Sequence, residues 1–368
     1  MKPTLNITPV SNWLKGAKRP IIIAGPCSAE SETQMLTTGK AIAAIDKNII
    51  FRAGIWKPRT RPNAFEGVGS IGLKWMKAVK EETGMLTATE VANGKHVEEC
   101  LNNGVDILWV GARTTVNPFS VQDVADALKG VDIPVFVKNP INPDLQLWIG
   151  ALERINQAGI TKLGAIHRGF HSHDNQSFRN SPKWELAIEL RTQCPDLPLI
   201  CDPSHICGNT ELIPYISQKA LDMDMHGLMI ETHITPAVAL SDAKQQVTPV
   251  QLDAILKKLV VRSASSDNVE FKSKLDQLRE SINKTDEELL HVLLNRMNIA
   301  DKIGTYKKEN DVTVLQTNRW ESLLNNRVQT GKLLGLNEQF VRNLYTLIHE
   351  ESVSRQTEIM NKSMAAAK

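Results

Sequence analysis

Eight short apolar segments alternate with amphipathic helical patterns over about the first 260 residues, and this alternation constrains the fold more than any other feature. The segments lie near residues 21–24, 49–52, 85–89, 107–110, 134–137, 162–166, 198–201 and 227–231. Because eight strand–helix units in ~250 residues are typical of a (β/α)8 barrel, we predict a TIM barrel of the α/β class. A doubly wound open sheet is the alternative, although no G-x-G-x-x-G follows the first segment.

The last third of the chain has a different composition. All 17 prolines lie at or before Pro249, which leaves 119 residues without a proline, and 18 of the 21 glycines fall in the same first stretch. Since proline and glycine mark turns, we expect the tail to contain a few long helices. We predict a barrel over residues 1–261, a polar linker over 262–271 and an all-α three-helix domain over 272–368.

Net charge and the lengths of the apolar runs exclude several classes of protein. Lys+Arg 43 and Asp+Glu 41 give a net charge of +2, so we expect no chain-wide basic surface for nucleic acid or anionic membranes. No apolar run approaches the ~20 residues that span a bilayer. The N-terminal sequence lacks a signal-peptide core, so we expect a cytoplasmic protein. The five cysteines form no C-x-x-C pair, which indicates free thiols.

Polar side chains follow nearly every predicted strand, where a TIM barrel carries its active site. The cations among them are Arg52, Lys57, Arg59, Arg61, Arg113, Lys138 and Arg168. These cations would repel one another at one barrel mouth unless anions lay between them, and the planar guanidinium fork binds both phosphate and carboxylate. The pattern predicts a substrate that carries both groups, or two phosphorylated substrates. The alternative is that several of these residues are solvated loop charges.

A second set of strand-end residues offers a thiol, an imidazole and two carboxylates, namely Cys27, His205, Glu231 and Asp242. Such a set can hold one divalent metal ion and leave a position for substrate. Mixed soft and hard ligands do not select among Mn, Fe, Co and Zn. The alternative is a buried, inert cysteine beside a histidine that caps a helix. The other four cysteines are expected to be packing or loop thiols.

Seven motifs in the predicted barrel resemble the type I family of 3-deoxy-D-arabino-heptulosonate 7-phosphate (DAHP) synthases. They are GPCSAE at 25–30, KPRT at 57–60, GAR at 111–113, Lys138, HRG at 167–169, DPSH at 202–205 and the Glu231–Asp242 pair. The resemblance covers about residues 18–258 and implies condensation of phosphoenolpyruvate with erythrose 4-phosphate. KPRT favours this reaction over the related octulosonate synthesis, which uses another aldose phosphate. Asn139–Pro140 stands where relatives often have a glycine-containing turn.

The resemblance also implies roles for individual residues. Phosphoenolpyruvate would be bound by Arg52, Lys57, Arg113, Lys138 and Arg168, and erythrose 4-phosphate by Arg59, Thr60 and Asp202. Cys27, His205, Glu231 and Asp242 become the ligands of one divalent metal ion. Lys57 would deliver a proton to the new alkoxide, and Asp202 would orient the site beside the metal-binding histidine.

In the tail, a stripe with helical spacing runs from Leu275 to Lys307 and carries the charges Arg279, Asp286 and Arg296 on an otherwise apolar face. About 40 helical residues span ~60 Å, whereas a compact domain of this size is only ~30 Å across. The helix would protrude and need a partner, and an intertwined homodimer is the simplest one. An ordinary bundle helix whose long cations reach solvent is the alternative.

The tail resembles the all-α chorismate mutase family over about residues 272–360, through LDQLRESINKTDEELLHVLLNRMNIADKIGTYK, NRWE and IHEESVSRQ. The resemblance implies rearrangement of chorismate to prephenate, with binding by Arg279 of a partner chain, Arg296, Lys307, Arg319, Ser352 and Gln356. Arg296, Lys307 and Gln356 would act on the reacting atoms, and the last two would donate to the ether oxygen. Trp320 stands where relatives carry an acid, and Gln316 stands where aspartate is frequent. Glu321 is the next residue after Trp320, so its side chain is turned about 100° around the helix from that position.

Together the two resemblances predict a bifunctional enzyme in which chorismate or prephenate, bound to the tail, inhibits the synthase. One alternative makes the tail a non-catalytic, dimerising and ligand-sensing module. Another keeps the barrel but gives it a different aldose phosphate acceptor.

Overall fold

The computed structural model describes residues 3–14, 19–57, 64–171, 177–263 and 265–361. The chain divides into two compact units, Met1–Ala264 and Ser265–Lys368, and each is described here by itself. No helix among the described residues is long and apolar enough to cross a membrane.

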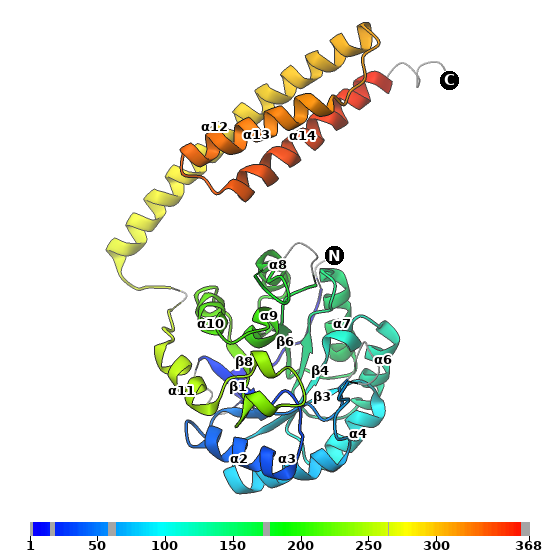
Figure 1. Ribbon diagram of the computed structural model, residues 1–368, viewed down its shortest axis with the longest axis vertical. Coiled ribbons are helices and arrows are strands. Elements are labelled where there is room, and N and C mark those ends of the chain that lie inside the picture. The colour runs from blue at the N-terminus through cyan, green and yellow to red at the C-terminus, as the bar shows by residue number, and fades with distance from the viewer. Residues whose placement is uncertain (1–2, 15–18, 58–63, 172–176, 264, 362–368) are drawn as a thin grey trace. The chain divides into compact units, whose positions relative to one another are not determined.

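The first unit is a closed barrel of eight parallel strands in sequence order (Figure 1). The strands are β1 (Ile21–Gly25), β2 (Ile50–Arg52), β3 (Thr87–Val91), β4 (Ile107–Val110), β5 (Val135–Lys138), β6 (Leu163–His167), β7 (Leu199–Cys201) and β8 (Gly227–Glu231). β1 closes the barrel by pairing with β8, from Ile21 opposite Gly227 to Gly25 opposite Glu231. The predicted TIM barrel is therefore confirmed, and the open sheet is excluded.

Helices surround the strands and connect them. They are α1 (Val10–Trp13), α2 (Glu32–Ala43), α3 (Ile71–Thr83), α4 (Gly94–Asn102), α5 (Ala112–Thr115), α6 (Pro118–Ala127), α7 (Leu145–Gln157), α8 (Trp184–Gln193), α9 (Pro203–Cys207), α10 (Ile213–Asp222) and α11 (Pro249–Lys258), with 3-10 turns η1 (Pro236–Val238) and η2 (Ala243–Gln245). The side chain of the N-cap residue accepts a hydrogen bond at the start of α2, α4, α6, α7, α9 and α11. In α11, the Thr248 side chain accepts from Gln251 N while the Gln251 side chain accepts from Thr248 N.

Two apolar layers hold the barrel together. Side chains inside it, among them Ile23, Trp109, Phe136 and Met229, form one cluster, and the strand–helix interface forms the other. Trp13 packs near the inner cluster, with its ring centroid 5.9 Å from that of Phe136. Because both strand faces are buried, the strands read as continuous apolar runs, which is the pattern expected of a parallel sheet.

Gly25 lets the end of β1 approach β2 closely. Its φ is 150°, and a Cβ atom there would lie 2.1 Å from the carbonyl oxygen of Arg52. Only glycine fits this position, which brings the following loop, with Cys27, against the end of β2.

The second unit consists of three helices, α12 (Val269–Glu309), α13 (Thr317–Leu333) and α14 (Glu338–Asn361). α12 is one continuous helix of 41 residues, and α14 packs against both α12 and α13. The residues that α12 buries, Met297, Ala300 and Gly304, lie in its C-terminal half. The predicted three-helix tail is confirmed.

Candidate active sites

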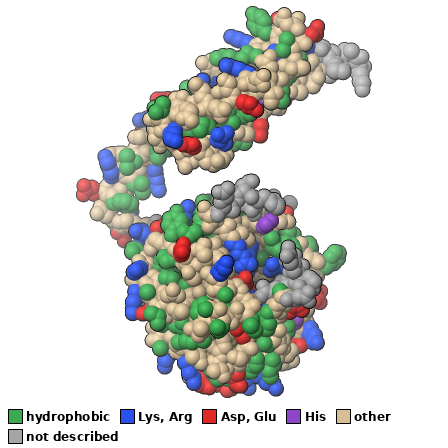
Figure 2. All heavy atoms as spheres, viewed as in Figure 1, with side chains coloured by type: hydrophobic (Ala, Val, Ile, Leu, Met, Phe, Trp, Pro, Cys, Tyr) green, Lys and Arg blue, Asp and Glu red, His purple; other side chains and the backbone are tan. Residues whose placement is uncertain are grey.

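The carboxyl ends of the strands bring the predicted polar residues to one pocket. Its lining includes Lys57, Glu90, Arg113, Lys138, Arg168, Arg179, His205 and Asp242. Figure 2 shows Lys and Arg side chains gathered in a hollow of the barrel unit. The residues come from strands, loops and short helices far apart in sequence, and the closed barrel brings these segments together at one end.

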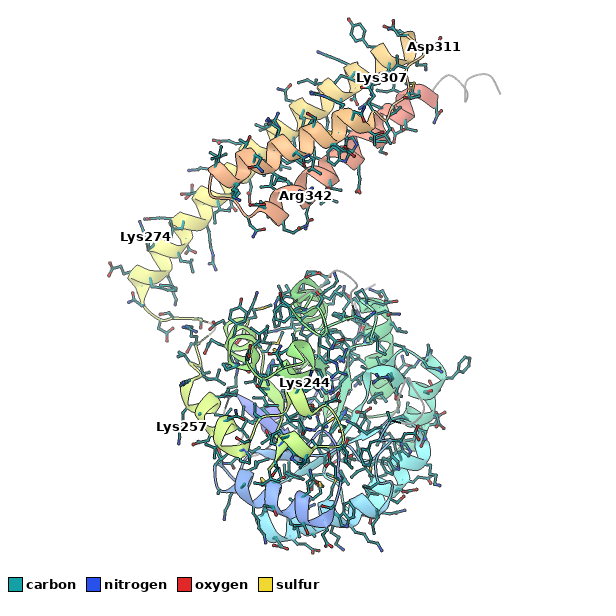
Figure 3. The ribbon with its side chains drawn as sticks, in the orientation of Figure 1. Lys244, Lys257, Lys274, Lys307, Asp311 and Arg342 are labelled. Carbon is teal, nitrogen blue, oxygen red and sulfur yellow. The ribbon has the colours of Figure 1, made fainter. Side chains whose placement is uncertain are left out.

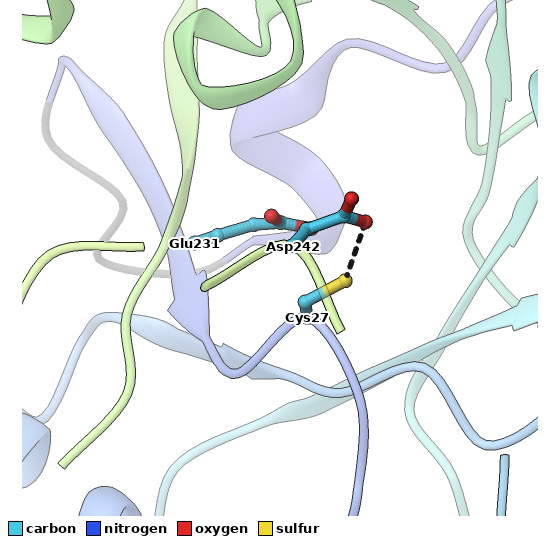
Figure 4. Close-up of side chains that lie close together, drawn as sticks. All are labelled: Cys27, Glu231 and Asp242. Atoms are coloured by element: carbon cyan, nitrogen blue, oxygen red, sulfur yellow. Dashed lines mark hydrogen bonds between the residues drawn. The ribbon is translucent and has the colours of Figure 1, made fainter. Parts of the chain in front are cut away.

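A thiol and two carboxylates meet at this end of the barrel. One ligand atom each from Cys27, Glu231 and Asp242 lie within 4.8 Å of one another (Figure 4). The Cys27 thiol donates to Asp242 Oδ2 at 3.2 Å. Burial raises the pKa of Cys27 to about 12, and the charges of Glu231 and Asp242 act in the same direction. A divalent cation at this point would offset that repulsion and favour the thiolate.

His205 lies at the edge of this trio. Its Nε2 is 3.7 Å from Glu231 Oε1, while its Nδ1 is 2.8 Å from Asp202 Oδ2. Burial lowers the pKa of His205, which favours the neutral imidazole that binds metals. A carboxylate on the second ring nitrogen is the usual support of a metal-binding histidine. The four predicted ligands are thus near one another, although His205 is outside the compact group.

Asp202 connects this histidine to the cations. It is fully buried, accepts from Lys138 Nζ at 2.7 Å, and caps α9 by accepting from His205 N at 3.1 Å. Burial alone would raise the pKa of Asp202, but His205 and Lys138 hold it well below its usual range. Asp202 is therefore a buried anion in contact with both His205 and Lys138.

The predicted cations gather at the same end of the barrel and contact several different groups. Arg52 is buried and donates to Glu231 Oε1 at 3.1 Å and to the Cys27 carbonyl at 3.0 Å. Lys57 Nζ donates to the same carbonyl at 2.9 Å. Burial lowers the pKa of Arg168 to about 10, and the positive charges of Arg179 and Arg113 act in the same direction. Cations this close favour a bound anion. Arg59, Arg61 and Thr60 lie outside the described residues.

The structure gives contacts at the site to three residues that the sequence analysis assigned no role. Arg179 donates to Asp242 Oδ1 at 2.9 Å and to Gln245 Oε1 at 2.6 Å, and Gln245 Nε2 donates to Glu231 Oε2 at 2.7 Å. Asn139 supports Arg168 instead of a glycine turn, because its Oδ1 accepts from Arg168 N at 2.7 Å. Arg179 and Gln245 belong to no motif, but their nearness to Asp242 in the folded chain reveals them.

In the helical unit, α12 and α14 carry four of the predicted residues. Arg296 Nη1 donates to Ser352 Oγ at 2.6 Å, and Lys307 Nζ donates to the Val314 carbonyl at 2.5 Å. Ser352 and Gln356 are buried on α14, and the Oε1 atom of Gln356 has no hydrogen-bond partner among the described residues. Lys307 lies towards the C-terminal end of α12, whereas Lys274 marks the other end (Figure 3).

Two predicted residues remain apart from this group. Arg319 is exposed near the start of α13. Arg279 is exposed on α12, 17 positions before Arg296, which corresponds to about 25 Å along the helix axis. One copy of the chain therefore does not place Arg279 beside Arg296.

Comparison with known proteins agrees with both units. The sequence profile of the DAHP synthetase I family matches residues 5–265, and that of chorismate mutase type II matches residues 278–357. The phospho-2-dehydro-3-deoxyheptonate aldolase of Thermotoga maritima is 30% identical over 61% of this chain and 64% of its own length, so the match spans less than two thirds of that relative. A 2-dehydro-3-deoxyphosphooctonate aldolase of Stenotrophomonas maltophilia is 29% identical over 67% of this chain and 92% of its own length.

Solved structures show the same architecture. The crystal structure of the Thermotoga maritima DAHP synthase superposes with a TM-score of 0.59 and 26% identity over 67% of this chain and 70% of that chain. A truncated form of that synthase superposes with a TM-score of 0.55 and 24% identity over 70% of this chain and 87% of that chain. This second match supports the fold alone. The chain therefore belongs to the DAHP synthetase I family and carries, after its barrel, a chorismate mutase type II domain.

Proposed function

We propose that the barrel condenses phosphoenolpyruvate with erythrose 4-phosphate to give DAHP and phosphate. The observation that carries this proposal is the group of cations beside the Cys27, Glu231 and Asp242 trio, all at the carboxyl ends of the strands. Phosphoenolpyruvate carries a phosphate and a carboxylate, so it matches a site with several guanidinium and ammonium groups.

The trio and His205 fit one divalent metal ion, which we propose as Mn, Fe, Co or Zn. Such an ion would supply Lewis acidity towards the aldehyde oxygen of the acceptor. The protein would hold it with Cys27, Glu231, Asp242 and His205, while Asp202 orients the imidazole and Arg179 orients Asp242.

The remaining steps depend on the chain's own side chains. Arg52, Arg113, Lys138 and Arg168, with Lys57, would bind phosphoenolpyruvate, while Arg59 and Thr60, with Asp202, would bind erythrose 4-phosphate. A carbon–carbon bond forms between C3 of phosphoenolpyruvate and the aldehyde carbon, and Lys57 donates the proton that the new alkoxide takes up. Water adds to C2, and the C2–O bond then breaks to release phosphate.

The test is the loss of phosphoenolpyruvate in the presence of erythrose 4-phosphate, before and after EDTA treatment. We expect turnover that disappears with EDTA and returns with added Mn²⁺. Cys27→Ser should abolish it, whereas the control Cys194→Ser, in a thiol remote from the trio, should not. Turnover in a sample shown to be free of metal would refute the metal site. Faster turnover with arabinose 5-phosphate would assign the barrel to the octulosonate reaction named for the Stenotrophomonas relative.

We further propose that residues 272–368 rearrange chorismate to prephenate. Arg296 and Arg319, with Arg279 of a partner chain, would bind the carboxylates, and Lys307 and Gln356 would donate to the ether oxygen as the C–O bond breaks. The Arg296–Ser352 contact, which joins α12 and α14 at this point, supports this role. Arg296→Ala should remove mutase turnover, while Arg342→Ala, an exposed arginine on α14, should leave it unchanged.

A homodimer would complete this site. Along α12, Leu278, Ile282, Leu289, Leu290 and Val292 are each more than half exposed. A second copy that covers these side chains would also bring its Arg279 to the first copy's Arg296. Sedimentation equilibrium should give a dimer or a larger homo-oligomer, and a monomer at 10 μM would contradict the proposal.

The functional domains would be the synthase over residues 1–261, a linker over 262–271 and the mutase over 272–368, in a cytoplasmic protein. We propose that prephenate or chorismate, bound to the mutase domain, inhibits the synthase, which requires different affinities for two states. Unchanged synthase activity in saturating prephenate would refute this regulation. If prephenate inhibits a protein that has no mutase turnover, the tail is a sensing module only.

A further inference from the structure

Trp320 and His349 stack face to face beside the proposed chorismate site. Trp320 is in the first turns of α13 and His349 is near the middle of α14. Their ring centroids are 3.9 Å apart, and the ring planes are within 8° of parallel. Both side chains are half-buried. A contact this close fixes the plane of the imidazole, because rotation of the ring would drive it into the indole.

His349 is on the face of α14 that carries the proposed mutase residues. His349, Ser352 and Gln356 have i, i+3, i+7 spacing, which places them on one side of the helix. Arg296 donates to Ser352 and also approaches the Ile348 carbonyl at 3.5 Å. The guanidinium of Arg296 therefore lies next to the turn of α14 that holds His349.

Two polar atoms on this face have no hydrogen-bond partner among the described residues. They are Nε2 of His349 and Oε1 of Gln356, and both are buried. Buried polar atoms without partners are uncommon in folded proteins, because they lose hydration and gain no replacement. Two of them on one helix face, beside Arg296, indicate that this face receives a polar ligand.

The charge state of His349 indicates which chemical group of the ligand it binds. Burial lowers the pKa of His349, the positive charges of Arg296 and Lys307 lower it further, and Glu350 opposes them. A neutral imidazole suits a neutral hydroxyl better than a carboxylate. Chorismate has two carboxylates, one ether oxygen and one ring hydroxyl, and the proposed site already matches the first three.

We propose that Nε2 of His349, held in place by Trp320, binds the ring hydroxyl of chorismate. This inference rests on the proposed mutase function. Trp320, which stands where relatives carry an acid, would then act by orienting this imidazole.

The test measures mutase kcat/KM for chorismate and for its analogue that lacks the ring hydroxyl. His349→Leu removes the nitrogen at similar volume, and His349→Gln keeps an amide near the Nε2 position. His291→Leu, an exposed histidine on α12, is the matched control. We expect His349→Leu to lower kcat/KM for chorismate about tenfold, His349→Gln to recover most of it, and His291→Leu to change nothing.

The analogue gives a result that a purely structural role would not. The wild-type protein should turn over the analogue about tenfold less efficiently than chorismate, whereas His349→Leu should not distinguish the two. A folded His349→Leu variant, checked by far-ultraviolet circular dichroism, that keeps full activity or full discrimination would overturn the inference. If that variant does not fold, loss of the hydroxyl preference by folded His349→Gln or by Trp320→Leu supports it, and unchanged preference in both overturns it.

These outcomes separate the inference from the function on which it rests. Normal wild-type turnover that Arg296→Ala removes and His349→Leu does not would leave the mutase function intact and reject only the role of His349. Absence of wild-type turnover would reject the mutase function, and the role of His349 would be rejected with it.

Discussion

Removing Arg52 from the barrel should destabilise it through the charge that is left behind. Arg52 and Glu231 are 1% and 0% exposed, and their side chains meet at 3.1 Å. The Arg52 guanidinium also lies 4.9 Å above the Trp109 ring. Arg52→Met keeps most of the side-chain volume, so the change mainly leaves the Glu231 carboxylate buried without this counter-charge.

The size of the effect follows from what remains around Glu231. Breaking a buried ion pair by removing one partner costs about 3–5 kcal/mol. Gln245 still donates to Glu231 at 2.7 Å, and His205 is still near, so we expect the lower end, about 3 kcal/mol. A unit the size of Met1–Ala264 has an unfolding entropy of about 0.55 kcal/mol/K, so Tm should fall by about 5 °C.

Thermal unfolding in EDTA at pH 7, followed by tryptophan fluorescence, measures this change without metal or substrate. Six of the seven tryptophans lie in the barrel unit, so the signal reports mainly on that unit. The double variant Arg52→Met/Glu231→Gln should be more stable than the sum of the two single changes predicts, because it leaves no unpaired charge. A shift below about 1 °C for Arg52→Met, or strict additivity in the double variant, would refute the reasoning.

Three further predictions concern other parts of the chain. Burial alone would raise the pKa of Asp224, but hydrogen bonds from Arg191 and Arg19 lower it. The Asp224 carboxylate therefore stabilises the fold at pH values above its unfolded pKa of ~3.9. This contribution is lost as the pH falls through the lower pKa of the folded state. Asp224→Asn should therefore cost about 1 kcal/mol in urea unfolding at pH 7 and progressively less as the pH falls below ~3.9, and a cost that does not change with pH would contradict the assignment. Gly304→Val should lower the free energy of unfolding of the helical unit by about 1–3 kcal/mol and reduce mutase activity. The reason is close packing, because even a Cβ at Gly304 would lie 3.0 Å from Gln356 Cγ. An unchanged far-ultraviolet melting curve would contradict this packing. Burial raises the pKa of every cysteine, so the native protein at pH 8 should show no rapid reaction with a disulfide reagent while all five thiols react after unfolding.

The sequence predicts the barrel well because its strands are continuous apolar runs that end in charged residues. Once the carboxyl ends of eight parallel strands meet at one rim, Arg52, Lys138 and Glu231 must be neighbours, although 179 positions separate the first from the last. The helical tail is equally predictable, since its stripe from Leu275 to Lys307 has helical spacing and contains no proline.

Residues that act through loop geometry are harder to predict. Arg179 follows no strand, and it contacts Asp242 only because two loops separated by 63 positions converge. The contact between Trp320 and His349 depends on how α13 packs against α14, which periodicity does not specify. On sequence alone, Trp320 is therefore only a departure from an expected acid, whereas the structure identifies a neighbouring imidazole that could replace it.

The first half of α12 has a consequence for the folding of the chain at low concentration. From residue 269 to 292 every residue except Leu275 is exposed, so these turns obtain little stabilisation from packing within one copy. An isolated helix of this length is governed by the helix–coil equilibrium and is only partly formed in water. Amide protons in this segment should therefore exchange quickly at high dilution and become protected as the protein concentration rises. Helix content would then serve as a direct gauge of self-association.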